Sequence, residues 1–320
     1  MITLSKIASL ANVSVSTASK AFSMSNEISE ETRNAVFEIA KKHGVFKKFY
    51  NAKYPKLVVG VICRDYNSPF YPDILKFIQS KLEEYGCDMS VASFDASSNK
   101  EEELYTYYTM YTDVDAILTI GRTIRLDENF PLPRVDISPW YIDEKTPTVV
   151  LNYESIRDAI LYFYEKKVES VGFITPYKKS GKVWKFEKFM NEIYGCVDRE
   201  LIEIIEEKSG AVIGYDGALS MIKKKRIPRA IFCERDDIAF GAIRAFYDNG
   251  YRVPEDVAIV GWNNNALGEY SIPTLSTIYI DTNKVVSESV DMLIKRMSGQ
   301  ECHNYTEVNS TFIARESSEI

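Results

Sequence analysis

The stretch Thr3–Ala21, TLSKIASLANVSVSTASKA, predicts two short helices at the start of the chain. Thr3 and Ser14 are residue types whose side-chain oxygen caps the first turn of a helix. Asn12 lies between them, where a tight turn often requires the left-handed backbone that asparagine tolerates. Apolar residues recur at the i, i+3, i+4, i+7 spacing of one helical face: Leu4, Ile7, Ala8 and Ala11. The stretch therefore indicates two closely packed helices.

The second helix has two different faces. Its buried positions are Ala18, Ala21 and Phe22, and its other face carries Val15, Ser16, Thr17, Ser19 and Lys20. Short polar side chains ending in one cation suit the major groove of DNA. The alternative is an ordinary helical hairpin with a solvated polar face.

A third helix favours the DNA-binding interpretation. Ser29-Glu30-Glu31-Thr32 is a strong helix start, with a capping residue and acids at the positive end of the helix dipole. The helix that it opens is expected to bury Val36, Ile39 and Ala40 and to end at Gly44. Three helices within 44 residues can close a small core of their own.

The segment TLSKIASLANVSVSTASKAF…ISEETRNAVFEIAKKHG resembles the DNA-binding headpiece of the LacI/GalR repressor family over the whole headpiece. The resemblance implies that Val15, Ser16 and Lys20 face base edges, whereas Thr17 and Ser19 reach phosphates. Position 20 is usually Arg in the family, and Lys lacks the bidentate fork that reads guanine best. The residues assigned to DNA binding are Thr3, Val15, Ser16, Thr17, Ser19 and Lys20, together with Lys47 and Lys48 of the following linker.

Residues 45–56, VFKKFYNAKYPK, form a basic, aromatic linker. In the family this region usually contains a hinge helix that pairs with its counterpart and wedges a Leu into the minor groove. That pattern is missing here and Pro55 would stop a helix, so we expect an atypical hinge. The linker aromatics either replace the wedge or pack the linker onto the body, and packing is favoured. Lys47 and Lys48 would add salt-sensitive phosphate contacts.

Charge is divided unevenly along the chain. The 320 residues have a net charge of −7, but residues 1–56 contain nine Lys or Arg and four Glu, which leaves −12 for the rest. A basic headpiece on an acidic body suits a nucleic-acid binder. The five single cysteines predict reduced thiols. Because neither a leader nor a long apolar run is found, we expect a cytoplasmic protein that does not enter a membrane.

From Leu57 onward the chain alternates between apolar strands and helices. Predicted strands cover 57–63, 89–94, 116–121, 135–138, 148–152, 170–175, 202–206, 230–233 and 257–262, and predicted helices lie near 71–86, 99–112, 154–166, 182–194, 215–224 and 236–249. This alternation predicts parallel sheets covered by helices. Two such series predict two lobes, with lobe 1 at about 57–166 and 282–320 and lobe 2 at about 167–281. Ligands of such sheets bind beyond the carboxyl ends of the strands, so paired lobes form a cleft.

The body resembles the same family in GVICRDYNSPFY, AIFCERDDIAFGAIRAFYDNGYRVPEDVAIVGWNN, PTLSTI and ARESS. The predicted fold class is therefore α/β, with a three-helix helix-turn-helix headpiece (1–44) and a two-lobed, periplasmic-binding-protein-like body of parallel sheets (57–320). The body is expected to bind the effector and to form the dimer. No apolar heptad tail follows it, so a homodimer is expected and no coiled-coil tetramer.

The resemblance also suggests an effector site. Positions that match the family's effector-contacting sites are Phe70, Asn152, Lys185, Arg235 and Asn263, and the aromatic residues Trp140, Tyr153 and Trp262 lie beside strand ends. The aromatic rings either stack on a sugar or belong to the core.

Two of these positions change the charge expected in the cleft. The family commonly has Asn where Arg235 stands and Asp where Asn263 stands, so each departure adds one positive charge. We hypothesise an anionic or phosphorylated sugar as effector, because a guanidinium binds carboxylate or phosphate bidentately. The alternative is that Arg235 pairs with Glu234 or Asp236 and never meets the ligand.

The sequence contains no Walker loop, GxSxG, HExxH or GxGxxG motif and only two histidines, His43 and His303. We therefore expect no enzyme activity, no cofactor and no metal site. The favoured function is that of a transcriptional regulator, a repressor, whose dimer binds an inverted-repeat DNA operator and responds to a small sugar or sugar-phosphate effector. The alternatives are a sugar-binding module of a transport system, a sugar-modifying enzyme, and a regulator controlled by a partner protein.

Overall fold

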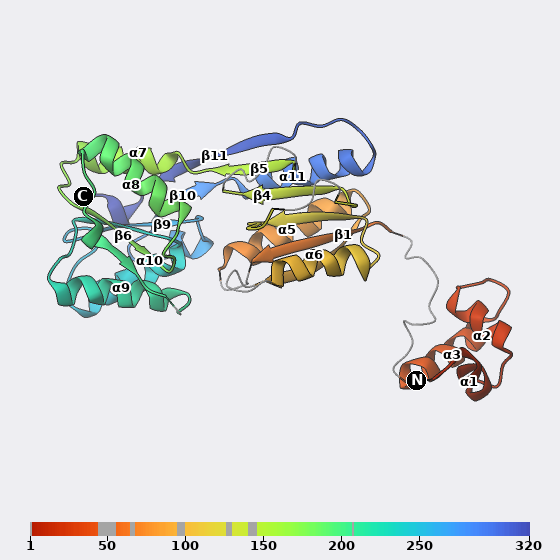
Figure 1. The fold of residues 1–320 in the computed structure, drawn as a ribbon. Helices are drawn as coiled ribbons and strands as arrows, with labels where there is room; N and C mark the ends of the chain where they lie inside the picture. Colours follow the sequence, from red (N-terminus) through yellow and green to blue (C-terminus); the bar gives the residue numbers. More distant parts are fainter. Residues whose placement is uncertain are drawn as a thin grey trace. The chain divides into compact units, whose positions relative to one another are not determined.

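The computed structural model describes residues 2–43, 56–64, 68–94, 100–125, 130–139, 146–206 and 208–320. The chain divides into two compact units, Met1–Lys56 and Leu57–Ile320. Figure 1 shows their elements, coloured from red at the N-terminus to blue at the C-terminus. The linker residues Lys47 and Lys48, the expected atypical hinge, and Trp140 lie outside the described residues, so the roles assigned to them stay predictions.

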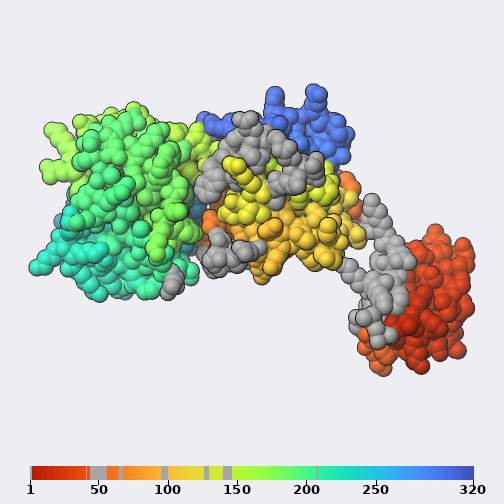
Figure 2. Space-filling view, in the orientation of Figure 1, coloured from red at the N-terminus to blue at the C-terminus, as the bar shows by residue number. Residues whose placement is uncertain are grey.

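The first unit contains the three expected helices, α1 (Leu4–Leu10), α2 (Val15–Phe22) and α3 (Glu30–Lys42). Thr3 and Ser14 cap α1 and α2 by accepting hydrogen bonds from backbone N–H groups in the first turns. Asn12 has φ of 54°, which confirms the left-handed turn. The helices close their own core from Ile7, Ala8, Ala18, Ala21, Phe22, Val36 and Ala40, and Ile39 packs on it half-buried. This unit is drawn in red in the space-filling view of Figure 2.

Lobe 1 of the body is a parallel sheet in the order β2-β1-β3-β4-β5. Its strands are β1 (Val58–Arg64), β2 (Asp88–Phe94), β3 (Ala116–Ile120), β4 (Arg134–Ser138) and β5 (Thr148–Asn152). Its helices are α5 (Phe70–Glu84), α6 (Lys100–Met110) and α11 (Thr282–Met297). Because side chains alternate along a strand, Val59 and Val61 pack in the core shared with α5 and α11, whereas Ile62 packs against tyrosines of α6.

Lobe 2 continues the sheet in the order β10-β9-β8-β6-β7. Its strands are β6 (Val171–Thr175), β7 (Ile202–Ile204), β8 (Ala230–Cys233), β9 (Ala258–Trp262) and β10 (Ser276–Ile280), and its helices are α8 (Gly181–Tyr194), α9 (Ala211–Lys224) and α10 (Asp236–Asp248). Phe173 and Phe232 pack on the α8 side of the sheet, while Ile174 and Ile231 pack with α9 and α10 on the other. Both faces of each sheet are therefore covered, as the continuous apolar strands predicted.

One strand, β11 (Tyr305–Ile313), connects the two sheets. Its first half runs parallel to β5, from Tyr305 opposite Thr148 to Asn309 opposite Asn152. Its second half runs antiparallel to β10, from Ser310 opposite Ile280 to Ile313 opposite Thr277. In Figure 1 it is the long blue arrow that passes from one lobe to the other.

The expected lobe boundaries need two corrections. Helix α7 (Ser155–Glu165) packs against α8 and β11, so it covers lobe 2 instead of lobe 1. The residues after Asn309 pair with β10 and, as the short 3-10 helix Glu316–Ser318, contact β9, so they also belong with lobe 2. Hydrophobic periodicity places a helix on the chain but does not tell which of two similar sheets it covers.

Two further predictions from the sequence concern membrane segments and cysteines. No helix in the described part of the chain is long and apolar enough to cross a membrane. All five cysteines are free, and Cys63, Cys87 and Cys233 are buried. The α/β class with a helix-turn-helix headpiece and a two-lobed body is confirmed.

Candidate functional site: an exposed helix face and an interlobe cleft

The headpiece exposes the outer face of α2. Val15 is 47% exposed although it is apolar, and Ser16 and Ser19 are exposed beside it. Thr17 is half-buried, and its backbone N–H donates to Ser14 Oγ at 2.9 Å. These side chains project from a closed core, so the helix can present them together to a partner.

Lys20 also lies on this face, where it forms an ion pair with Glu27 of the following loop. Both side chains remain partly open to solvent, at 42% and 69% of their surface. Exposed pairs of this kind contribute little to stability, so Lys20 can exchange Glu27 for another acceptor at little cost.

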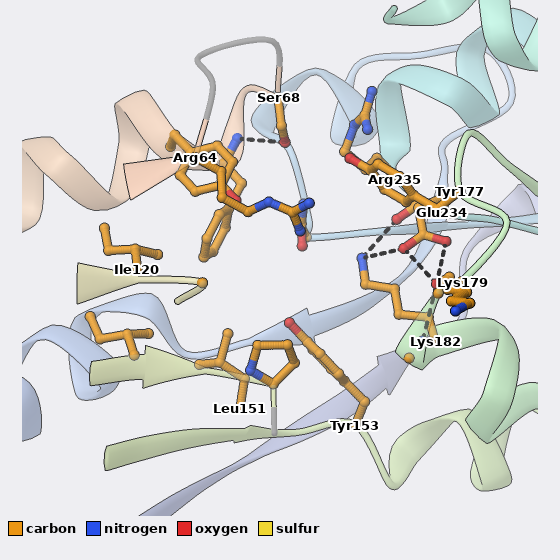
Figure 3. A pocket seen from close by; sticks show the side chains of 18 residues that line it. Arg64, Ser68, Ile120, Leu151, Tyr153, Tyr177, Lys179, Lys182, Glu234 and Arg235 are labelled. Atoms are coloured by element: carbon orange, nitrogen blue, oxygen red, sulfur yellow. Dashed lines mark hydrogen bonds and ion pairs between the residues drawn. The ribbon is translucent and has the colours of Figure 1, made fainter. Parts of the chain in front are cut away.

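The second candidate site is a cavity of about 160 Å³ between the lobes. Every strand that contributes to it does so near its carboxyl end, as expected for parallel sheets. Lobe 1 supplies mainly apolar side chains together with Arg64, and lobe 2 supplies mainly polar and charged ones (Figure 3). The described lining residues are Arg64, Ser68, Phe70, Tyr71, Ile120, Gly121, Ile137, Pro139, Leu151, Tyr153, Tyr177, Lys179, Ser180, Gly181, Lys182, Glu234, Arg235 and Asn263.

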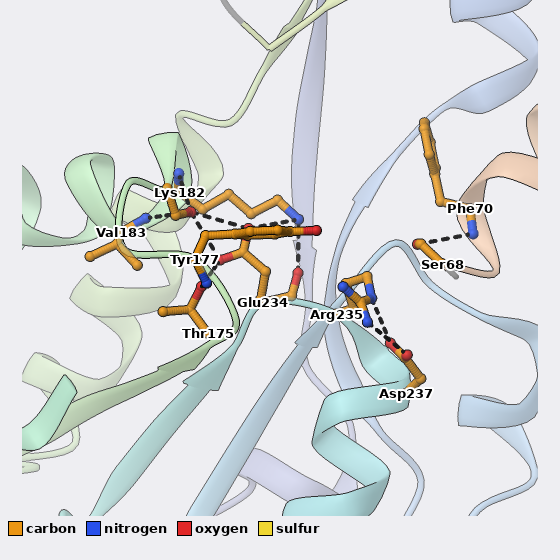
Figure 4. A network of polar contacts seen from close by, with 10 residues as sticks. Ser68, Phe70, Thr175, Tyr177, Lys182, Val183, Glu234, Arg235 and Asp237 are labelled. Atoms are coloured by element: carbon orange, nitrogen blue, oxygen red, sulfur yellow. Dashed lines mark hydrogen bonds and ion pairs between the residues drawn. The ribbon is translucent and has the colours of Figure 1, made fainter. Parts of the chain in front are cut away.

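Glu234 is the centre of a buried polar network in lobe 2 (Figure 4). Its carboxylate accepts hydrogen bonds from Thr175 Oγ1 at 2.8 Å and from Ser180 Oγ at 2.9 Å. The same two hydroxyl oxygens accept from backbone N–H groups, Thr175 from that of Tyr177 and Ser180 from those of Lys182 and Val183. Ser180 is the N-cap of α8, so this network fixes the start of the helix against the end of β8.

Lys182, in the first turn of α8, brings its ammonium to the same point. Its Nζ donates to the backbone oxygen of Glu234 at 2.8 Å and lies 3.8 Å from that residue's Oε1. The ammonium stands 4.4 Å from the ring centre of Trp262 and 5.6 Å from that of Tyr153. Burial lowers the pKa of Lys182 to about 8, although the Glu234 charge opposes the shift.

Three of the predicted effector residues, Phe70, Arg235 and Asn263, line the cavity. Trp262 is fully buried behind it and packs edge-on against Tyr153, with ring centres 5.0 Å apart. Tyr153 points into the cavity (Figure 3), and burial raises its pKa, so the phenol stays neutral.

Asn152 and Lys185 do not line the cavity. Lys185 pairs with Glu154 at 2.7 Å, and Asn152 donates to Asn309 Oδ1 at 3.1 Å. Asn152 ends β5, and Lys185 reaches it from α8, donating to Asn152 Oδ1 at 3.4 Å.

Arg235 lies on the cavity wall, but its charge is matched. Its Nε and Nη2 donate to the two carboxylate oxygens of Asp237 at 3.0 and 3.1 Å. The sequence alternative was wrong in naming Glu234 or Asp236 as the partner of Arg235, because the carboxylate that accepts its hydrogen bonds is that of Asp237. An anionic ligand therefore requires cations other than Arg235.

Sequence reasoning missed Lys182, Arg64 and Lys179. The family motif directed attention to Lys185, which lies three residues after Lys182 and so almost one helical turn further along α8. Ser180 gave a usable signal for this turn. A serine before a predicted helix is a capping residue, so the first turn of α8 could be expected to lie at the carboxyl ends of the strands, where ligands bind.

Each of the two units matches a known protein family. Residues 3–45 match the model of bacterial regulatory proteins of the lacI family, and residues 161–318 match that of the periplasmic binding protein-like domain. The transcriptional regulator RegA of Clostridium saccharobutylicum is 26% identical over 312 residues, which cover 92% of each chain.

Solved structures share the fold. The lac repressor dimer bound to operator and an anti-inducer superposes with a TM-score of 0.70 at 19% identity, covering 99% of both chains. The regulator CelR in complex with cellobiose gives a TM-score of 0.68 at 21% identity, covering 99% of this chain and 100% of that one. With its lacI-type headpiece, its periplasmic-binding-protein-like body and regulators as full-length relatives, the chain belongs to the LacI/GalR family of transcriptional regulators.

Proposed function

We propose that the protein is a repressor that binds an inverted-repeat operator as a homodimer and releases it when a small sugar-like effector occupies the interlobe cleft. The main support for this proposal is the exposed outer face of α2 on a closed three-helix core, because this face can present Val15, Ser16 and Lys20 to a major groove. An operator on the chromosome requires the protein to act in the cytoplasm.

A dimer is supported by an apolar surface on lobe 2. Leu267, Tyr270 and Ile272 are 66%, 82% and 94% exposed within one short segment. Exposed apolar clusters of this kind mark interaction sites. Two subunits would place two headpieces on the two halves of a palindromic site.

The cleft supports control by a small molecule. Its volume is below the roughly 300–1,000 Å³ of typical ligand pockets, which favours a small effector. A ligand that contacts both lobes stabilises one interlobe angle, and operator affinity changes if that angle sets the headpiece positions. The coupling must be reciprocal, so operator DNA should also change effector affinity.

The test is to select bound sequences from random DNA and then to measure affinity for the selected site. The double variant Val15→Ala with Ser16→Ala should lose selectivity among sites, whereas Ser9→Ala, at an exposed position on α1, should retain it. Failure to enrich any sequence, or unchanged selectivity of the double variant, would contradict the proposal.

A further inference from the structure

Cationic side chains outnumber anionic ones in the described lining of the cavity. Four of its described lining residues are basic, Arg64, Lys179, Lys182 and Arg235, and one is acidic, Glu234. The pairing of Arg235 with Asp237 cancels one of these charges. Within the described lining, the remaining balance is three cations against one carboxylate.

Glu234 is poorly placed to accept bonds from a neutral sugar. Its two oxygens already receive the hydroxyl protons of Thr175 and Ser180, and Lys182 stands beside Oε1. A carboxylate that holds vicinal sugar hydroxyls must turn both oxygens to the ligand. Here the Glu234 oxygens instead accept hydrogen bonds from Thr175 and from Ser180, the N-cap of α8.

Lys182, in contrast, keeps donors for a ligand. An ammonium has three N–H groups, and one of them donates to the Glu234 backbone oxygen. Arg64, from the opposite lobe, lies with its guanidinium 5.7 Å from the Tyr177 ring centre (Figure 3). Lys179 lies on the loop that ends at the N-cap of α8. The three cations therefore line the cavity from both lobes.

We propose that the effector is a small acid, a sugar derivative whose carboxylate or phosphate is bound by Lys182 with Arg64 and Lys179, while its carbon skeleton lies on the apolar wall of lobe 1. The inference rests on the proposed effector role of the cleft. It moves anion recognition from Arg235, where the sequence placed it, to a cation on α8. Because Arg64 belongs to lobe 1 and Lys182 to lobe 2, one anionic group between them would draw the lobes together.

Calorimetric titration of the full-length protein tests the inference with glucose, gluconate and glucose 6-phosphate as probes. We expect the two acids to bind and glucose to bind at least tenfold more weakly, since hydrogen bonds to charged groups contribute about twice as much as neutral ones. Comparison of gluconate with glucose 6-phosphate tells whether the anionic group is a carboxylate or a phosphate.

The variant Lys182→Met should weaken the binding of the acids by about tenfold or more, and Lys182→Arg should restore part of it. Lys188→Met makes the same change at an exposed position of the same helix and should bind the acids like the unmodified protein. Operator binding by each variant shows that it is folded.

Three results would overturn the inference: glucose binding as tightly as the acids, no binding of either acid at millimolar concentration, or unchanged acid binding by Lys182→Met. The repressor proposal would survive these results if selected DNA is still bound and released by a neutral sugar. Conversely, acid binding without any DNA selectivity would remove the repressor proposal and leave the effector class intact.

Discussion

Lys182 has an unusual environment for a lysine, and this predicts how ligand binding depends on pH. Burial lowers its pKa to about 8, so the ammonium form that binds an anion dominates below pH 8 and is lost above it. Affinity for the acidic effector should be steady near pH 7 and fall by up to about tenfold per pH unit above pH 8. Titrations across this range would measure the effect, and Lys182→Arg should remove it because arginine stays charged.

Asp236 makes a second pH-dependent contribution, this time to stability. Burial raises its pKa to about 7, although its oxygens accept from the Asn265 backbone N–H at 2.5 Å and from Thr277 Oγ1 at 2.8 Å. The folded state then holds a proton that the unfolded state has lost between about pH 4 and pH 7, so this contribution to stability decreases as pH rises through 7.

Asp236→Asn should therefore flatten the pH dependence of the free energy of unfolding in that window, as measured by urea denaturation. Asp158→Asn, an exposed carboxylate on α7, is the matched control and should leave the dependence in place. A pH profile unchanged by Asp236→Asn would contradict the assignment.

Glu27 pairs with Lys20, the cation on the face of α2 that we propose binds DNA. Glu27→Gln removes the ion pair with Lys20 and one negative charge near the expected phosphates, so DNA affinity should rise severalfold at low salt while headpiece stability hardly changes. Fluorescence anisotropy with labelled DNA at several salt concentrations measures this. Lower affinity of the variant would mean that Glu27 positions Lys20 for binding.

At the level of elements, helices α9 and α10 pack without room for a side chain between them. A Cβ on Gly214 would lie 1.7 Å from the Ile238 backbone oxygen, and one on Gly241 would lie 1.8 Å from that of Ala211. Both distances are far below contact, and both obstacles are backbone atoms. Gly241→Ala should therefore destabilise the protein by about 3 kcal/mol or prevent folding, as measured by denaturation. Lys223→Ala, on the exposed side of α9, should have little effect.

Most elements could be predicted because their sequence signals are local. Ser14 predicts the start of α2 because serine is a capping residue, and the continuous apolar run of β1 predicts a buried strand. β11 was not predicted, because its nine residues, YTEVNSTFI, are mainly polar and mostly not buried. Its strand character comes from two partners, β5 and β10, that are distant in sequence.

The site was predictable in its location but less so in its chemistry. The alternation of strands and helices predicted a cleft at the carboxyl ends of the strands, and the resemblance to the family assigned Phe70, Arg235 and Asn263 to it. The pairing of Arg235 with Asp237 depends on rotamers at the start of α10, which no sequence pattern specifies. Lys182 lies almost one helical turn before the family's position and was not identified from the sequence, although the N-cap Ser180 marks the turn that contains it.

At the scale of the whole molecule, the apolar segment Leu267–Ile272 should control assembly. Ile272→Asp places a charge where a second subunit is expected to pack, and Ile272 itself is 94% exposed in the single chain, so its replacement should not disturb the fold. The variant should sediment as a monomer at concentrations where the unmodified protein is dimeric, and its operator affinity should fall at least tenfold. Tyr247→Asp, exposed on α10, is the comparison. A dimeric Ile272→Asp protein would place the interface elsewhere.

The strand β11 has a mechanical consequence for any movement between the lobes. It pairs with β5 up to Asn309 and with β10 from Ser310 onward, so no unpaired residue separates the two pairings. A change of interlobe angle must therefore twist β11 between Asn309 and Ser310, where Ser310 Oγ also shares a hydrogen bond with Ser155 Oγ at 2.6 Å, together with the two other crossings, from β5 to α7 and from β10 to α11. The resistance of the backbone to twisting at these crossings limits how far a ligand of given affinity can rotate one sheet against the other.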